Sequence, residues 1–127
     1  MRAALDEVER RFPGLPLVLG GFSFGSSMAL RVGVAEPRAK ALFALGFPLD
    51  MVQDWSFLND SHKPRLFVQG ASDQFGSGER LLSVVAQLPE PHSAVVIPES
   101  DHFFNGHLDA LQAALDSWLS TRPWADA

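Results

Sequence analysis

A serine lies at the centre of a short glycine-containing string that could supply a nucleophile. The string matches G-x-S-x-G and reads Gly21-Phe22-Ser23-Phe24-Gly25. A continuous apolar run at residues 15–22 leads into it, and a helix-compatible run follows it from residue 26. This context predicts a strained strand–turn–helix connection with the serine at the tip of the turn, exposed above a sheet. We therefore predict that Ser23 is a nucleophile.

The residues around Ser23 suit this chemistry. We expect a Cβ atom at Gly21 or Gly25 to clash, because the turn is tight. The N-terminus of the following helix places a positive dipole end where negative charge would develop. The alternative interpretation is an ordinary glycine- and serine-rich turn of the kind that many α/β proteins contain.

An acid and a base follow two later predicted strands. A serine hydroxyl becomes a good nucleophile when a base takes its proton and a carboxylate orients that base. Asp73 follows the strand at residues 65–70, and His102 follows the strand at residues 94–98. Carboxyl ends of parallel strands share one edge of the sheet, which is where ligands bind in open α/β sheets. The sequence thus predicts a Ser23–His102–Asp73 triad.

Other residues compete for the roles of acid and base. Asp101 is adjacent to His102, but neighbouring side chains in a loop tend to diverge. Asp50 follows the strand at residues 41–46 and stays open as the alternative acid. Three histidines in polar or proline-flanked segments are expected to be solvated surface residues: His62, His92 and His107.

The elements that must position these residues alternate along the chain. Short apolar runs predict strands, and apolar residues at helical spacing predict helices. The predicted strands are residues 15–22, 41–46, 65–70 and 94–98, and the predicted helices are residues 5–12, 26–36, 77–88 and 105–120. Residues 48–64 are predicted to be irregular, with one helical turn near 54–58. Strict alternation implies an α/β fold, a three-layer sandwich with a mostly parallel sheet, in a single domain over residues 1–127.

Two helices carry clear apolar stripes. In the helix at residues 77–88 the side chains expected to face inward are Leu81, Leu82, Val84, Val85 and Leu88. In the last helix they are Leu108, Leu111, Leu115 and Trp118.

The composition excludes several classes of protein. Apolar residues make up 46% and charged residues 20%, which is ordinary for a soluble domain. The chain has no cysteine, so disulfides and thiolate metal sites are excluded, and we expect no metal and no cofactor. The net charge is −5 without a basic run, which argues against nucleic acid and anionic membrane as partners. The apolar runs are shorter than the ~20 residues of a transmembrane helix, and the first residues lack a signal core, so a cytoplasmic protein is expected.

Three strings of the sequence resemble the small bacterial predicted α/β-superfamily hydrolases, which are related to dienelactone hydrolases and serine peptidase-like esterases. The strings are Leu19-Gly20-Gly21-Phe22-Ser23-Phe24-Gly25-Ser26, Gln69-Gly70-Ala71-Ser72-Asp73-Gln74-Phe75 and Ser100-Asp101-His102-Phe103-Phe104-Asn105-Gly106. The resemblance spans nearly the whole chain. It implies that Ser23 is the nucleophile, Asp73 the acid and His102 the base, and that the backbone N–H of Phe24 donates to the oxyanion.

The resemblance also implies a truncated α/β-hydrolase fold that supplies the last four strands of the usual eight. A second oxyanion donor normally comes from a loop after an earlier strand, and that loop has no counterpart in this sequence. The loss of one such donor typically costs about 10²–10³ in kcat. A truncated enzyme of this kind can therefore keep its triad and still be slow.

Two classes of function follow. The first is a carboxylesterase-like serine hydrolase of a small ester, with an apolar acyl pocket lined by Phe22, Phe75 and Phe103 and also by Phe24 and Phe104. The second is a weak or inactive remnant that serves as an interaction or scaffold module, or a partial product that needs its other half. An intact triad favours catalysis, because the residues of an inactive triad have no physical reason to remain together in this order. The apolar edge at residues 17–21 predicts a homodimer or higher oligomer that covers it.

Overall fold

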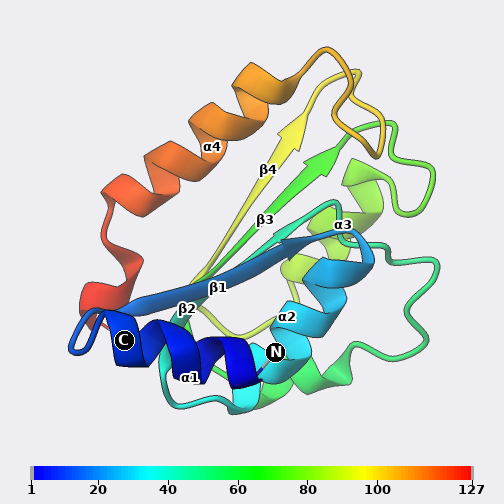
Figure 1. Cartoon of the computed structure of the whole chain (residues 1–127). Helices are drawn as coiled ribbons and strands as arrows, with labels where there is room; N and C mark the ends of the chain where they lie inside the picture. The colour runs from blue at the N-terminus through cyan, green and yellow to red at the C-terminus, as the bar shows by residue number, and fades with distance from the viewer. Residues whose placement is uncertain (1, 127) are drawn as a thin grey trace.

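Four parallel strands form one sheet in the computed structural model, which describes residues 2–126 (Figure 1). The strands are β1 (Leu17–Phe22), β2 (Ala39–Leu45), β3 (Arg65–Gly70) and β4 (His92–Ile97), and they lie side by side in the order β1-β2-β3-β4. The helices are α1 (Arg2–Arg11), α2 (Phe24–Ala35), α3 (Gly78–Val85) and α4 (Leu108–Ser120), with 3-10 turns η1 (Ser56–Asp60) and η2 (Pro123–Asp126). Each predicted element is present, and the α/β class is confirmed.

Helices cover both faces of the sheet, as the three-layer prediction requires. Figure 1 shows α4 on one side of the strands and α2 and α3 on the other. On the α2 and α3 side the core contains Leu30, Leu42, Phe47, Phe67 and Leu81. On the α4 side it contains Ala41, Leu66, Val68, Ile97 and Trp118. Every residue of β3 is buried, because helices and their side chains pack on both faces of the sheet.

The structure moves some of the predicted bounds. α4 begins at Leu108 and not at residue 105, because Phe104 and Gly106 have positive φ angles of 57° and 76° that a right-handed helix excludes. α2 begins at Phe24, directly after the predicted nucleophile. Two residues of the predicted stripes are exposed, Leu82 on α3 and Leu108 on α4, so the expectation that they face inward is wrong.

The outer edge of β1 has no strand beside it within residues 2–126. Residues 17–21 are half-buried, and apolar side chains that precede them are exposed, including Phe12 and Leu15. A strand edge of this kind offers unpaired N–H and C=O groups for pairing with another chain. Self-association through β1 therefore stays a prediction.

We expect light scattering at micromolar concentration to give the mass of a dimer or a larger assembly. The Leu15→Glu variant should shift the distribution toward monomer, because it places a charge beside the β1 edge. Leu108→Glu is the matched control, since Leu15 and Leu108 are 61% and 64% exposed and Leu108 begins α4. A monomeric native chain, or equal effects of the two variants, would contradict association through β1.

Candidate active site

Ser23 forms the turn between β1 and α2. Its φ and ψ angles are 56° and −127°, a left-handed conformation that typically costs about 1–3 kcal/mol in a residue other than glycine. The turn is fixed from two sides: the Ser23 N–H donates to the Leu45 carbonyl at 2.8 Å, and the Ser26 N–H and hydroxyl donate to the Ser23 carbonyl at 2.9 and 2.5 Å. The predicted strand–turn–helix connection is therefore present, with its strain offset by hydrogen bonds.

The two glycines of the G-x-S-x-G string differ in their role. A Cβ atom on Gly21 would lie 2.5 Å from the Gly25 carbonyl oxygen, so the turn closes only around a glycine at this position. A Cβ atom on Gly25 would meet no atom within 4 Å. The expectation of a clash is correct for Gly21 and wrong for Gly25, since the main chain of Gly25 approaches Gly21 while its own Cα faces open space.

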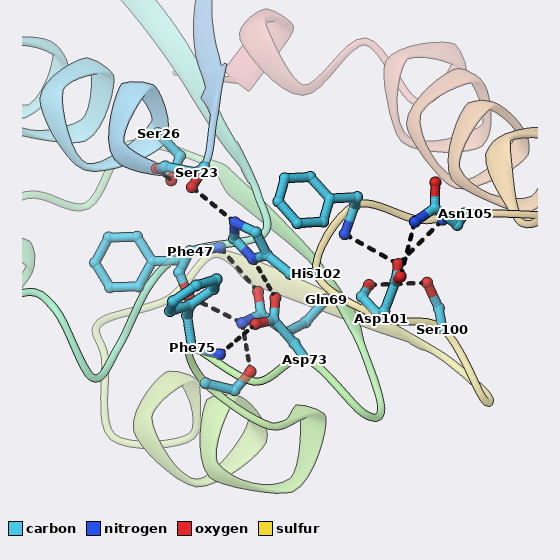
Figure 2. A network of polar contacts seen from close by, with 12 residues as sticks. Ser23, Ser26, Phe47, Gln69, Asp73, Phe75, Ser100, Asp101, His102 and Asn105 are labelled. Carbon is cyan, nitrogen blue, oxygen red and sulfur yellow. Dashed lines mark hydrogen bonds and ion pairs between the residues drawn. The ribbon is translucent and has the colours of Figure 1, made fainter.

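The structure brings the three predicted residues into one hydrogen-bonded chain (Figure 2). The Ser23 Oγ lies 2.7 Å from His102 Nε2, and His102 Nδ1 lies 2.8 Å from Asp73 Oδ2. An ionised carboxylate only accepts hydrogen bonds. His102 Nδ1 therefore donates to Asp73, and Nε2 is left to accept the Ser23 hydroxyl proton. The His102 and Asp73 side chains are almost completely buried, so water does not compete for these bonds.

The main chain also holds Asp73 in place. The residue lies in the turn after β3, where its N–H donates to the Gly70 carbonyl at 3.2 Å. Its second carboxylate oxygen accepts from the Phe75 N–H at 2.7 Å. One oxygen thus fixes the carboxylate to its own loop, while the other faces the imidazole.

The competing acids have other partners. The Asp101 carboxylate accepts from the backbone N–H groups of Phe103 and Asn105 at 3.0 and 3.1 Å, and from the Asn105 side chain at 2.9 Å. Figure 2 shows these contacts on the far side of the loop from the imidazole. Asp50 forms an ion pair with Arg80 at the surface. Asp73 is thus the carboxylate that contacts His102.

Comparison with known proteins identifies the family. The sequence model of a family described as an alpha/beta hydrolase domain matches residues 1–117. The chain belongs to this family. A curated, uncharacterized protein of Rickettsia prowazekii (strain Madrid E) is 28% identical to this chain, over 94% of this chain and 53% of that protein.

Solved structures show the same hydrolase fold. An α/β serine hydrolase without lid from Xanthomonas campestris is 29% identical, with a TM-score of 0.79, over 99% of this chain and 56% of its own. A dienelactone hydrolase from Anabaena variabilis shares the fold, with 23% identity and a TM-score of 0.71, over 93% of this chain and 56% of its own. This chain thus spans about half the length of the relatives it matches.

Three phenylalanines surround the imidazole of this alpha/beta hydrolase domain. The ring centroids of Phe75, Phe103 and Phe22 lie 4.7, 5.0 and 5.3 Å from that of His102. Phe22 and Phe103 are also exposed, so they cover His102 and face solvent at once. Phe104 is buried in the core on the α4 side and does not line the site. The Phe24 side chain is exposed, while its N–H lies in the first turn of α2, where amides have no partner within the helix.

The remaining predicted positions lie outside this hydrogen-bonded chain. His62 is exposed, and His92 and His107 are half-buried, so all three side chains reach the surface. Among residues 2–126, no group of three or more His, Asp and Glu side chains is placed to hold a metal ion. In the same residues, none of the helices is both long enough and apolar enough to cross a membrane. A cavity of about 660 Å³ opens beside Leu17 and Arg122 and is not lined by Ser23 or His102.

Gln69 takes part in building the site of this hydrolase domain and was not singled out from the sequence. It is fully buried in β3, where its amide accepts from the Phe47 N–H at 2.9 Å and donates to the Phe47 and Gly76 carbonyls at 2.9 and 2.7 Å. Gln69 thereby ties the segment after β2 to the loop that carries Asp73. A polar residue within the apolar run at residues 65–70 was the available signal.

Because of Asp101, which lies in the loop that carries His102, we expect the free energy of unfolding to depend on pH. The N–H and side-chain donors of Asn105 hold the pKa of the Asp101 carboxyl below its usual range. A carboxyl whose pKa is lower in the folded chain stabilises the fold above its unfolded pKa, and this contribution is lost as the pH falls through the folded value. Below about pH 4, the free energy of unfolding should therefore fall more steeply in the native chain than in Asp101→Asn. Urea unfolding across this range measures it, with Asp116→Asn on α4 as the control, and equal slopes in the native and Asp101→Asn chains would contradict the expectation.

Proposed function

We propose that this chain is a carboxylesterase-like serine hydrolase that cleaves a small ester with Ser23, His102 and Asp73. The observation that carries the proposal is the continuous chain of hydrogen bonds of 2.7 and 2.8 Å from the Ser23 hydroxyl through His102 to Asp73. A serine on a strained turn, a base within hydrogen-bond reach and a buried carboxylate behind that base form the arrangement that activates a hydroxyl group. Membership of the alpha/beta hydrolase family supports it.

The reaction would pass through an acyl-enzyme. Ser23 Oγ attacks the carbonyl carbon of the ester while its proton moves to His102 Nε2, and the Phe24 N–H donates to the oxyanion that forms. The tetrahedral intermediate then breaks its bond to the alcohol oxygen, which takes the proton from His102. Water repeats these steps on the acyl-enzyme and releases the acid. Asp73 holds the imidazole and stabilises the imidazolium in both halves.

The aromatic residues around His102 favour an uncharged, apolar substrate. Phe22, Phe75 and Phe103 pack on the imidazole, and Phe22 and Phe103 offer exposed ring surface beside His102. The transfer of apolar substrate groups from water to such a surface is favourable. A small acyl ester therefore fits the site better than a charged substrate. The Xanthomonas campestris relative is a serine hydrolase without lid, and this supports a site that opens to solvent.

Hydrolysis of p-nitrophenyl acetate tests the proposal. We expect steady release of p-nitrophenol and, in a rapidly quenched sample, one acetyl group on the peptide that contains Ser23. Ser117→Ala, which removes an exposed serine of α4, serves as the control and should leave the rate unchanged. A folded chain without activity, or acetylation at another residue, would support a non-catalytic interaction module instead.

A further inference from the structure

The segment formed by the last residue of β2 and the two residues after it contacts each part of the site but carries no reactive group. The Leu45 carbonyl accepts from the Ser23 N–H at 2.8 Å. The Gly46 N–H donates to the Val68 carbonyl of β3 at 2.9 Å. Phe47 exchanges two hydrogen bonds with the Gln69 amide, which also binds the loop of Asp73. Residues 45–47 therefore join the serine turn, the central strand and the acid loop into one unit.

Gly46 is the residue of this segment that faces the imidazole. A Cβ atom on Gly46 would lie 3.3 Å from His102 Cε1, 3.4 Å from His102 Nδ1 and 3.4 Å from the His102 carbonyl oxygen. The first of these separations is tighter than ordinary van der Waals contact, so the neighbouring ring would have to move. Gly46 also has a φ of 65°, which favours glycine.

The imidazole has little free space to move into. Phe22, Phe75 and Phe103 pack around the ring, and the side chain is 2% exposed. A shift away from Gly46 must therefore change the 2.8 Å contact with Asp73 or the 2.7 Å contact with Ser23. The shift needed is a few tenths of an ångström. Since a misplacement of about 1 Å in a catalytic group can cost about 10² in rate, a several-fold loss is expected here.

We propose that Gly46 is a positioning residue: its missing side chain sets the place of the His102 imidazole between Asp73 and Ser23. This inference rests on the function proposed above, in which His102 is the base. It adds a residue that acts through the imidazole without touching the substrate.

Two pairs of variants separate positioning from backbone strain. Gly46→Ala is compared with Gly14→Ala, because Gly14 has a φ of 83° and a Cβ atom there would meet nothing within 4 Å. Both alanines incur a left-handed backbone, but only the one at position 46 contacts the imidazole. Gly46→Asn and Gly14→Asn repeat the comparison with a residue that tolerates positive φ better. The readouts are the Tm, the rate at which a fluorophosphonate labels Ser23, and the downfield proton NMR signal of the His102 Nδ1–H, assigned by its loss in His102→Ala.

We expect both alanine variants to lower the Tm by similar amounts. Gly46→Ala and Gly46→Asn should also label at Ser23 about 3–10 times more slowly than the native chain and shift the Nδ1–H signal, while the Gly14 variants do neither. Labelling of the Gly46 variants within about twofold of the Gly14 variants would overturn the inference. If both Gly46 variants unfold while both Gly14 variants stay folded, the inference is also overturned, because Gly46 would then serve the fold alone. If the native chain resists labelling but the signal still moves in the Gly46 variants, the proposed hydrolysis fails and the positioning of His102 stands.

Discussion

The Ser23→Ala variant should hydrolyse p-nitrophenyl acetate up to about 10⁶-fold more slowly than the native chain, and His102→Ala should lose about as much, since such residues act as a unit. The reason is the single path of the proton: Ser23 Oγ can lose it only to His102 Nε2, 2.7 Å away. Without the hydroxyl there is no acyl-enzyme, and without the imidazole the hydroxyl keeps its proton. The measurement is the initial rate over a range of ester concentrations.

The double variant distinguishes a functional pair from separate effects. If Ser23 and His102 act together, Ser23→Ala with His102→Ala should be no slower than either single variant. Ser26→Ala is the comparison variant, since the Ser26 hydroxyl donates to the Ser23 carbonyl but lies outside the proton path. Retention of most of the native rate by Ser23→Ala in a folded chain would contradict the assignment of the nucleophile.

The Asp73→Asn variant should lower kcat by about 10⁴, the cost of an amide in place of the orienting carboxylate. An amide can place its NH₂ group toward His102 Nδ1, which favours the tautomer whose proton sits on Nε2 and blocks the base. The buried position of Asp73 prevents water from restoring the correct tautomer. Steady-state rates with p-nitrophenyl acetate give the effect.

The two competing carboxylates provide matched controls for Asp73. Asp101→Asn keeps an oxygen that can accept from the Phe103 and Asn105 amides, and Asp50→Asn removes a surface ion pair with Arg80. Near neutral pH both variants should retain most of the native kcat, because exposed ion pairs and surface polar changes have small effects. A loss in Asp50→Asn as large as that in Asp73→Asn would transfer the role of acid to Asp50.

Much of the fold could be predicted because local and global signals agree along this chain. The apolar run at residues 65–70 became the fully buried strand β3, and Pro37 and Pro98 lie just past a helix and a strand, where the predicted segments end. The start of α4 was missed, since the left-handed backbone of Phe104 leaves no mark in its residue type and the Asn105-Gly106 pair, a turn signal, was included in the helix. The exposure of Leu108 could not be predicted, because a leucine in the first turn of a helix is buried only if something packs on it.

For the site, the order of residues along the chain was informative, and contacts between distant segments were not. Ser23, Asp73 and His102 each follow a strand, so the parallel sheet was enough to bring them to one edge. The contact between Gly46 and His102 joins segments far apart in sequence, and no spacing rule predicts which glycine a ring will approach. The lack of crowding at Gly25 was missed for the same reason, because the close approach depends on the path of the main chain.

Intact-mass analysis after treatment with a fluorophosphonate tests the activation of Ser23 most directly. These probes react with serines whose hydroxyl group is activated by a base and only slowly with other serines. We predict one adduct on the native chain, located at Ser23 by peptide mapping, and no adduct on Ser23→Ala or His102→Ala. A chain that is folded by circular dichroism but carries no adduct, or carries it equally in His102→Ala, would contradict a working Ser23–His102–Asp73 triad.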